Sequence, residues 1–185
     1  YITGGVNCYN ILSNTWQRFD AEKYGTKRVS SILLYDDKIW VGTDRGLVSY
    51  DPDQEKWRFF TTIEKGVVSL SAFSDLLLFV TADHILYSLD RRNLELTQVK
   101  EQVNPQFIYT KKHIYYPQGC FSGSPIYGFV VQYDTESDKL TYYPTRRGIL
   151  GSPHTMAFDG NYIWFTGAAI SRYEVDANKW EVFTC

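Results

Sequence analysis

The feature that most constrains this chain is an internal repeat with a step of about 40 residues. In each copy a tyrosine or leucine precedes a polar residue, and a large apolar residue follows six positions after that polar residue. The polar members are Asn10, Asp51, Asp90, Asp134 and Glu174, so successive copies lie 41, 39, 44 and 40 residues apart. The large apolar members are Trp16, Trp57, Leu96, Leu140 and Trp180. This spacing is typical of supersecondary units that bury a core only by stacking on their neighbours.

Each copy predicts four short strands. In the second copy, residues 29–34, 38–43, 46–50 and 56–61 are rich in β-branched and aromatic residues, and Asp, Gly and Pro separate them. Such alternation of strand formers and turn formers indicates antiparallel hairpins. The fifth copy repeats the pattern over 155–158, 162–166, 170–173 and 179–183, and no segment shows a sustained helical period. The sequence therefore predicts an all-β fold, a β-propeller of four-stranded antiparallel blades.

The predicted domain is a single β-propeller over residues 1–185, possessing about five blades at approximately 1–20, 29–61, 67–99, 106–143 and 153–184. The first blade supplies strands only at 1–3, 6–9 and 16–19, so it lacks its inner strand. Because residue 1 is Tyr rather than Met, we expect the chain to be part of a longer protein. The alternative is a five-blade ring that a strand following Cys185 would close.

The repeated polar and apolar residues have predicted structural roles. The polar side chain lies where the third strand turns into the fourth, so its oxygen can accept hydrogen bonds from the backbone N–H groups of that turn. We expect Trp16, Trp57 and Trp180 to pack against a neighbouring blade rather than to bind a ligand.

The composition excludes several classes of protein. With 44% hydrophobic and 22% charged residues, the chain is neither disordered nor collagen-like. Its longest apolar run, 76–80, is too short for membrane insertion of this segment. A net charge of -2 and the lack of a basic track with interleaved aromatics argue against a nucleic-acid partner. Cys8, Cys120 and Cys185 are too scattered for a disulfide scaffold or a metal site, so we expect ordinary thiols, although one pair could bridge in an oxidising compartment.

Residues 38–47 (KIWVGTDRGL), followed by Tyr50 and Asp51, resemble the two-component-regulator propeller repeat. That repeat occurs in extracytoplasmic sensor domains of bacterial hybrid histidine kinases. The resemblance is recognisable in the fifth copy at 162–167, weak in the third at 78–81 and weaker in the fourth at 114–117. The first copy instead resembles a kelch repeat, at 1–5 and 9–16. These resemblances imply a propeller used for binding or sensing, in the periplasm or at the cell surface, although a fold does not by itself define a function.

No catalytic motif is present. The sequence has no GxSxG, HExxH, phosphate-binding GK[S/T], GxGxxG or EF-hand signature. His84, His113 and His154 belong to different blades, and only His84 and His154 are expected on the same face. We therefore predict no catalytic residue, no metal site and no cofactor.

A binding site is predicted on the face where the loops between second and third strands and the linkers between blades emerge. Loops bring Asp44, Arg45, Asp83, His84 and Ala168 to this face, and linkers bring Lys27, Arg28, Lys65, Arg146 and Arg147. An insertion at 118–128 adds Phe121 and Tyr127 among glycines. The predicted ligand- or partner-binding residues are Arg45, His84, Phe121, Tyr127, Arg146, Arg147 and His154. The arginines can hold a carboxylate or phosphate through two hydrogen bonds, whereas the alternative is an ordinary solvated surface.

Three functions remain open. The first is a non-catalytic module that binds a small molecule, a glycan or a protein partner, as the sensor or recognition part of a larger signalling or surface protein. The second is a propeller-type lyase or hydrolase with a cross-blade site of His84, His154 and acidic loop residues. The third is a protein-assembly scaffold that uses the 118–128 insertion or a blade edge. The first is favoured because the repeats and the resemblance support it and the acid–base constellation of an enzyme is lacking.

Overall fold

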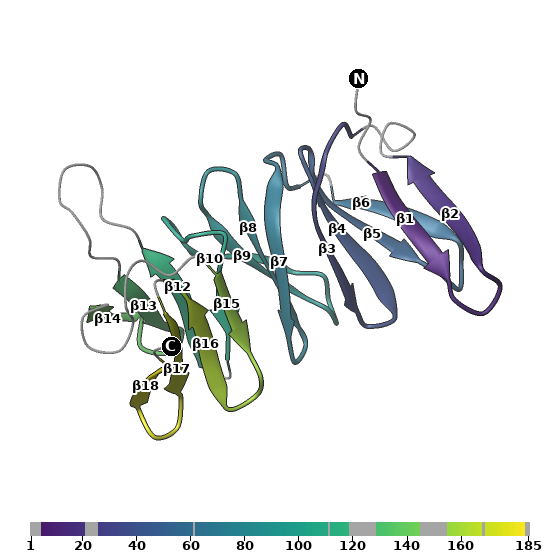
Figure 1. The fold of residues 1–185 in the computed structure, drawn as a ribbon. Coiled ribbons are helices and arrows are strands. Elements are labelled where there is room, and N and C mark those ends of the chain that lie inside the picture. The colour runs from purple at the N-terminus through teal and green to yellow at the C-terminus, as the bar shows by residue number, and fades with distance from the viewer. Residues whose placement is uncertain are drawn as a thin grey trace. The chain divides into compact units, whose positions relative to one another are not determined.

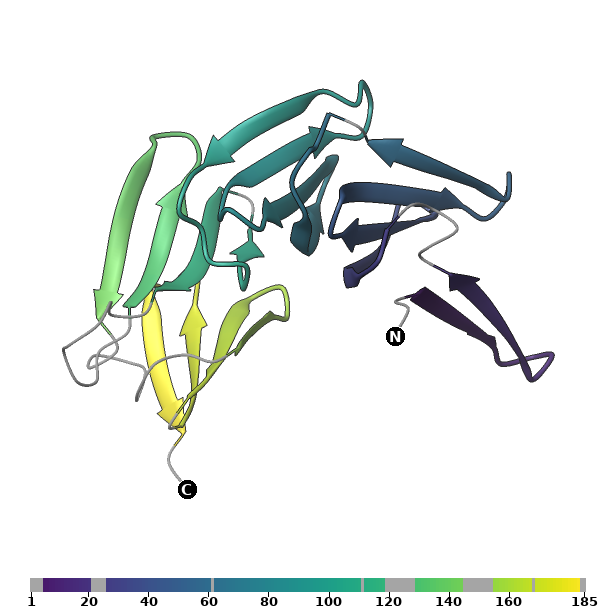
Figure 2. The same ribbon diagram turned by 90° about the horizontal axis from the view of Figure 1, so that it is seen from above.

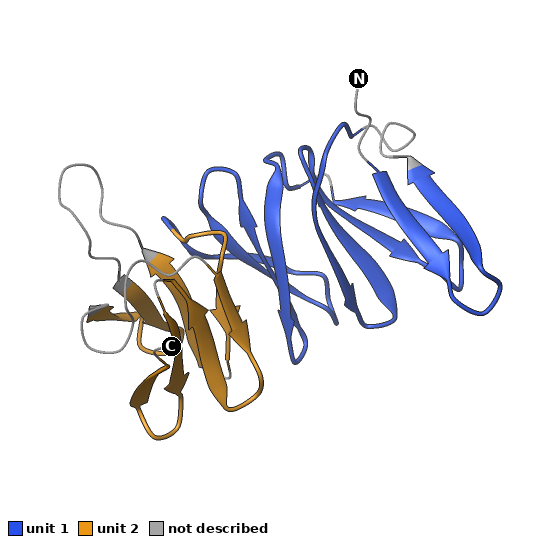
Figure 3. Ribbon diagram, in the orientation of Figure 1, with its two compact units in different colours: residues 1–102 blue, residues 103–185 orange. Residues whose placement is uncertain are grey.

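The computed structural model describes residues 5–20, 26–60, 62–110, 112–118, 129–144, 155–167 and 169–183. In these ranges every regular element is a β-strand and no helix occurs. The chain divides into two compact units, residues 1–102 and 103–185, and each is described by itself (Figure 3). The predicted all-β class with four-stranded antiparallel sheets is confirmed, while the number of blades stays a prediction.

Unit 1 contains three antiparallel sheets, and in each sheet the strands follow one another in chain order (Figures 1 and 2). The first is a hairpin of β1 (Gly5–Asn10) and β2 (Thr15–Asp20). The second contains β3 (Val29–Tyr35), β4 (Lys38–Thr43), β5 (Gly46–Asp51) and β6 (Lys56–Phe60). The third contains β7 (Val67–Phe73), β8 (Leu76–Thr81), β9 (Leu86–Asp90) and β10 (Leu96–Lys100).

Unit 2 contains two sheets of four strands, again antiparallel and in chain order. One is formed by β11 (Ile108–Tyr109), β12 (His113–Gln118), β13 (Phe129–Asp134) and β14 (Lys139–Pro144). The other is formed by β15 (Thr155–Phe158), β16 (Tyr162–Thr166), β17 (Ile170–Glu174) and β18 (Lys179–Phe183). The strands predicted for the second and fifth copies agree with these bounds to within one residue at either end, and the strand predicted at 1–3 lies outside the described residues.

The repeated polar residue closes the turn between the third and fourth strands, as predicted. Asp51 Oδ1 accepts hydrogen bonds from the backbone N–H groups of Asp53 and Gln54, at 3.1 and 3.2 Å. The equivalent oxygens of Asn10, Asp90 and Asp134 also accept from their own turns. Glu174 makes no such bond within the described part of the chain, because its carboxyl lies one methylene farther from the backbone.

The same turn has a second repeated property. The residue four positions after the polar one adopts a left-handed backbone in all five copies, with φ between 52° and 58°. These residues are Asn14, Glu55, Leu94, Asp138 and Asn178. Glycine adopts this conformation without steric cost and Asn and Asp tolerate it, so Glu55 and Leu94 are the positions that store local strain.

The core of unit 1 lies between the sheets β3–β6 and β7–β10. Trp40 and Leu47 of the first sheet and Val67, Leu77, Phe79 and Leu89 of the second are buried together with the linker residue Ile63. Gly42 is a point of close approach between the two sheets, since a Cβ atom there would lie 2.9 Å from the carbonyl oxygen of Val67. The glycine of the WVGT segment therefore permits β7 to lie directly against β4.

The core of unit 2 combines apolar and tyrosine side chains. Tyr115, Val130, Ile163, Phe165 and Tyr173 are buried together. A hydrogen-bond chain connects the two sheets of this unit. Gln132 donates to the Tyr115 hydroxyl at 3.0 Å and accepts from Tyr143 at 2.6 Å, and the hydroxyls of Tyr143 and Tyr173 are 3.4 Å apart. Burial raises the pKa of both Tyr115 and Tyr173 well above the usual value, because the tyrosinate anion would lose its hydration.

The predicted packing of the repeated tryptophans is confirmed at two positions and wrong at the third. Trp57 contacts Phe19 of the neighbouring hairpin, with ring centroids 5.7 Å apart, and Trp180 contacts Tyr143 of the neighbouring sheet at 5.8 Å. Trp16 is instead 72% exposed and contacts Tyr9 of its own hairpin. In the described residues of unit 1, no sheet covers that face of the hairpin.

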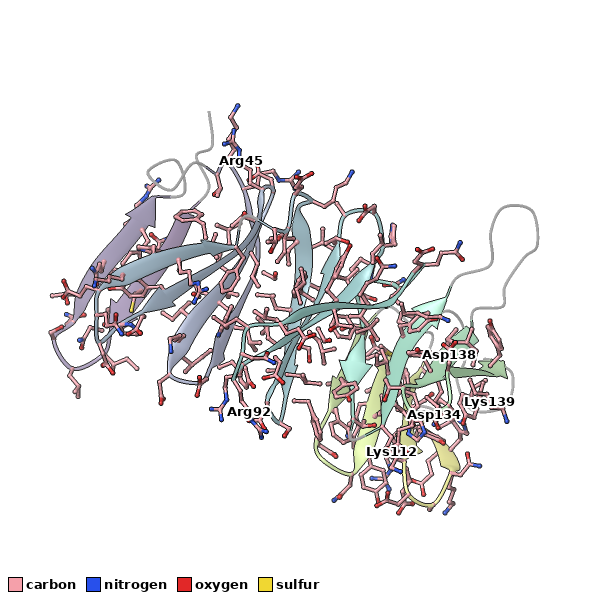
Figure 4. The ribbon with its side chains drawn as sticks, turned by 180° about the vertical axis from the view of Figure 1, so that it is seen from behind. Arg45, Arg92, Lys112, Asp134, Asp138 and Lys139 are labelled. Carbon is pink, nitrogen blue, oxygen red and sulfur yellow. The ribbon has the colours of Figure 1, made fainter. Side chains whose placement is uncertain are left out.

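At the end of unit 1 that carries the β3–β4, β7–β8 and β9–β10 turns, an ion-pair cluster connects two sheets. Arg91 contacts Asp36 at 2.5 Å and Asp75 at 3.0 Å, and Arg92 also contacts Asp75. Arg45 lies at the opposite end of unit 1 from Arg92 (Figure 4). The two ends thus differ, since one is closed by turns and ion pairs while the other carries loops and linkers.

Candidate functional site

The end of unit 1 that carries Arg45 is a continuous surface of loops and linkers. It consists of the β4–β5 loop (44–45), the β8–β9 loop (82–85), and the linkers 26–28 and 62–66. We call it the loop face. Asp44 Oδ1 accepts hydrogen bonds from the backbone N–H groups of Lys27 and Arg28, at 3.1 and 3.2 Å. The acidic residue of the DRG segment therefore fixes the linker that enters its own sheet.

Glycines bring the second linker against both loops. Gly46 has φ of 122°, and a Cβ atom there would lie 2.5 Å from the carbonyl oxygen of Ile63. Gly66 lies against the Asp44 backbone, since a Cβ atom on Gly66 would be 3.1 Å from the Asp44 carbonyl oxygen. The Gly66 carbonyl in turn accepts a hydrogen bond from Ala82 N at 2.8 Å. The two loops are therefore connected through linker 62–66.

Two buried threonines at the strand ends hold the loops. Thr43 Oγ1 donates to the Gly46 carbonyl at 3.0 Å and accepts from Arg45 N at 3.2 Å. Thr81 occupies the equivalent position, and its hydroxyl lies 2.7 Å from Asp83 Oδ1 and 3.0 Å from the Ile85 carbonyl. The Thr81 hydroxyl, and beyond it the nearby Lys65 and His84, lower the pKa of the Asp83 carboxyl, so Asp83 is ionised at neutral pH.

Two of the seven predicted binding residues lie on the loop face. Arg45 is exposed at the tip of the β4–β5 loop (Figure 4). His84 is exposed in the β8–β9 loop, in a left-handed conformation with φ of 65°, and its N–H donates to the Thr81 carbonyl at 2.9 Å. The other five, Phe121, Tyr127, Arg146, Arg147 and His154, lie outside the described residues. Their role in binding, and that of Arg45 and His84, stays a prediction.

A cavity of about 240 Å³ opens on the loop face. Linker residues Thr62, Ile63, Glu64 and Lys65 form one wall. The other lining residues are Thr81, Asp83, Tyr87 and Leu96, from β8, the β8–β9 loop, β9 and β10. We call this the linker cavity. The sequence placed Lys65 and Asp83 on this face but gave no sign that Tyr87 and Leu96 contribute, since both occupy ordinary strand positions.

Two features are absent from the described residues, a cluster of metal ligands and a membrane-spanning helix. No group of three or more His, Cys, Asp or Glu side chains within these ranges is arranged to hold a metal ion. The same ranges also contain no helix of the length and apolarity that a membrane span requires.

No known protein family matches the chain, and no curated protein matches it. Solved structures do resemble it. The extracellular domain of a putative one-component system from B. thetaiotaomicron has a TM-score of 0.62 at 19% identity, over 99% of this chain and 24% of that chain. The extracellular domain of a putative hybrid two-component system from the same organism has a TM-score of 0.67 at 15% identity, over 98% and 26% of the two chains. BamB from Moraxella catarrhalis has a TM-score of 0.60 at 14% identity, over 97% and 58%.

The chain thus spans about a quarter of the length of the two B. thetaiotaomicron domains that it resembles. At these sequence identities the likeness concerns the fold alone. It defines the class of protein as an all-β, propeller-like protein built from stacked four-stranded sheets.

Proposed function

We propose that this chain is a non-catalytic ligand-binding module of β-propeller type, with about five blades of which the first lacks its inner strand. In this proposal it is the sensor or recognition part of a larger signalling or surface protein and lies outside the cytoplasm. The ligand is a small molecule that binds at the loop face. Phe121, Tyr127, Arg146, Arg147 and His154 belong to unit 2 and lie outside the described residues, and their proposed role is ligand or partner contact in that unit.

The observation that carries the proposal is the construction of the loop face. Its backbone is fixed by Asp44, Thr43 and Thr81, whereas the side chains of Arg45 and His84 remain at the surface. A rigid scaffold that presents exposed polar side chains beside a cavity is the usual construction of a binding site on a repeat protein.

The structural neighbours support the sensing role and the location by analogy of fold. Two of them are extracellular domains of a putative one-component and a putative hybrid two-component system. Because one fold serves many functions, the loop face rather than the analogy has to be tested.

The proposal is tested by thermal-shift screening of the full chain against amino acids, monosaccharides, oligosaccharides and dicarboxylates. A ligand that binds only the folded state raises the melting temperature, since its binding free energy adds to that of folding. The rise should be lost in the double variant Arg45→Ala/His84→Asn, in which Asn is chosen because it tolerates the left-handed backbone at residue 84. It should persist in the matched double variant Gln54→Ala/Lys56→Ala, at the opposite end of the sheet β3–β6.

NMR of the recovered ligand separates binding from catalysis. A ligand that is recovered unchanged after prolonged incubation agrees with the proposal. Conversion of the ligand by the wild-type chain would favour a propeller-type enzyme, and a shift that survives the loop-face substitutions would place the site elsewhere.

A further inference from the structure

The linker cavity has the size of a small metabolite site. Its volume of about 240 Å³ is many times the roughly 10–15 Å³ that one ordered water requires. It lies below the roughly 300–1,000 Å³ of pockets that enclose drug-sized ligands. A ligand with about the dimensions of a single amino acid therefore matches the available space.

The charged groups of the cavity carry both signs. Asp83 and Glu64 contribute carboxylates, and Lys65 contributes an ammonium group. Within the described part of the chain, neither the Glu64 nor the Lys65 side chain forms a direct hydrogen bond or ion pair, although Lys65 lies near enough to Asp83 to lower the pKa of that carboxyl. The Thr81 hydroxyl orients Asp83 through Oδ1. All three residues are exposed, so charges of both signs are accessible to an occupant of the cavity.

The remaining lining is apolar and rigid. Ile63 is buried, and Leu96 and Tyr87 are partly buried. The Tyr87 ring stacks on the buried ring of Phe79, with centroids 5.5 Å apart and planes inclined by 18°. This stacking fixes the ring plane, so the cavity has a preformed apolar surface beside its charged groups.

We propose that the linker cavity binds a zwitterionic α-amino acid with an apolar side chain. The inference rests on the proposed function, because it names the ligand class of the loop face. Lys65 pairs with the ligand carboxylate, and Asp83 together with Glu64 pairs with its ammonium group. The ligand side chain lies against Tyr87, Leu96 and Ile63.

The test is isothermal titration calorimetry of the full chain with L-leucine and L-phenylalanine. Each should bind, whereas leucine methyl ester and N-acetyl-leucine, which lack one of the two charges, should bind about 10–100-fold more weakly. Lys65→Met should weaken binding of L-leucine by the same factor, with a smaller effect on the methyl ester because the ester lacks the carboxylate. Asp83→Asn should show the reverse selectivity, with its smaller effect on N-acetyl-leucine.

Matched variants at the opposite end of the sheet β3–β6, Lys56→Met and Asp53→Asn, remove the same charges and should leave binding unchanged. Unaltered melting temperatures of all four variants exclude loss of folding as the cause. Equal affinity for the zwitterion and its charge-deleted analogues would overturn the proposal. Binding of an uncharged monosaccharide that depends on Tyr87 but not on Lys65 would overturn the amino-acid assignment while leaving ligand binding at the loop face intact.

Discussion

Gly42→Ala tests whether the two large sheets of unit 1 pack as closely as the structure indicates. The added methyl group would lie 2.9 Å from the Val67 carbonyl oxygen, 3.0 Å from Val67 Cγ1 and closer still to Ser31 Oγ. The serine hydroxyl can rotate away, but the Val67 oxygen belongs to the backbone of β7 and can retreat only if the sheet moves.

The expected loss in the free energy of unfolding of Gly42→Ala follows from this geometry. Extra methyl groups in a well-packed core destabilise by about 1–3 kcal/mol. Replacing glycine by alanine in a strand recovers a fraction of that, since alanine loses less conformational entropy on folding. For a unit of 102 residues, a cost of about 1 kcal/mol corresponds to a fall in melting temperature of about 4–8 °C.

Urea denaturation followed by circular dichroism measures the free energy of unfolding, and hydrogen exchange shows where the loss occurs. We expect faster exchange in β3–β10 of unit 1 and unchanged exchange in unit 2. In the double variant Ser31→Ala/Gly42→Ala part of the stability should return, because the Ser31 hydroxyl is buried without a partner in the described residues. A stability of Gly42→Ala equal to that of the wild type would refute the close approach of β4 and β7.

Three further predictions concern the repeated positions and the tyrosine network. Trp57→Ala should lower the free energy of unfolding by about 3 kcal/mol, because the Trp57 ring fills the contact with Phe19. Trp16→Ala should lower it by less than about 0.5 kcal/mol, because Trp16 is exposed. Equal losses for the two variants in urea denaturation would contradict this assignment. Glu55→Gly should raise the free energy of unfolding by about 0.5–1 kcal/mol, since it replaces a left-handed non-glycine residue by glycine. A lower free energy of unfolding for this variant would show that the turn is not strained. Burial raises the pKa of Tyr115 and Tyr173, so their contribution to stability is complete below the unfolded pKa of about 10 and is lost as the pH rises beyond it. Tyr173→Phe should flatten that alkaline loss in pH-dependent denaturation, and an unchanged slope would contradict the assignment.

Much of the fold could be predicted because it follows from local chemistry. Val, Ile and Trp in the segment 38–43 favour a strand, the aspartates after it favour turns, and both properties depend on neighbours in sequence. The repeat then identified equivalent residues, which is why the turn-closing role of Asp51, Asp90 and Asp134 was predicted correctly.

The features that could not be predicted depend on contacts between sheets. The hydrogen-bond chain through Gln132, Tyr143 and Tyr173 has no counterpart in the described residues of the other copies, so the repeat did not predict it. Trp16 occupies the same repeat position as Trp57, yet its exposure depends on which sheet lies beside it. Likewise, the linker cavity is formed where linker 62–66 meets β8, β9 and β10, and of its lining residues only Lys65 and Asp83 could be placed at the loop face from the sequence.

The central claim is that a small ligand binds at the loop face of unit 1, and amide NMR of the isotope-labelled full chain tests it most directly. Titration with L-leucine should shift the amide signals of residues 62–66 and 81–87 in a saturable manner, while those of the Arg91–Asp75 cluster at the other end of unit 1 stay unchanged. Saturable shifts confined to that cluster or to unit 2, or no shifts with any ligand that raises the melting temperature, would contradict the account.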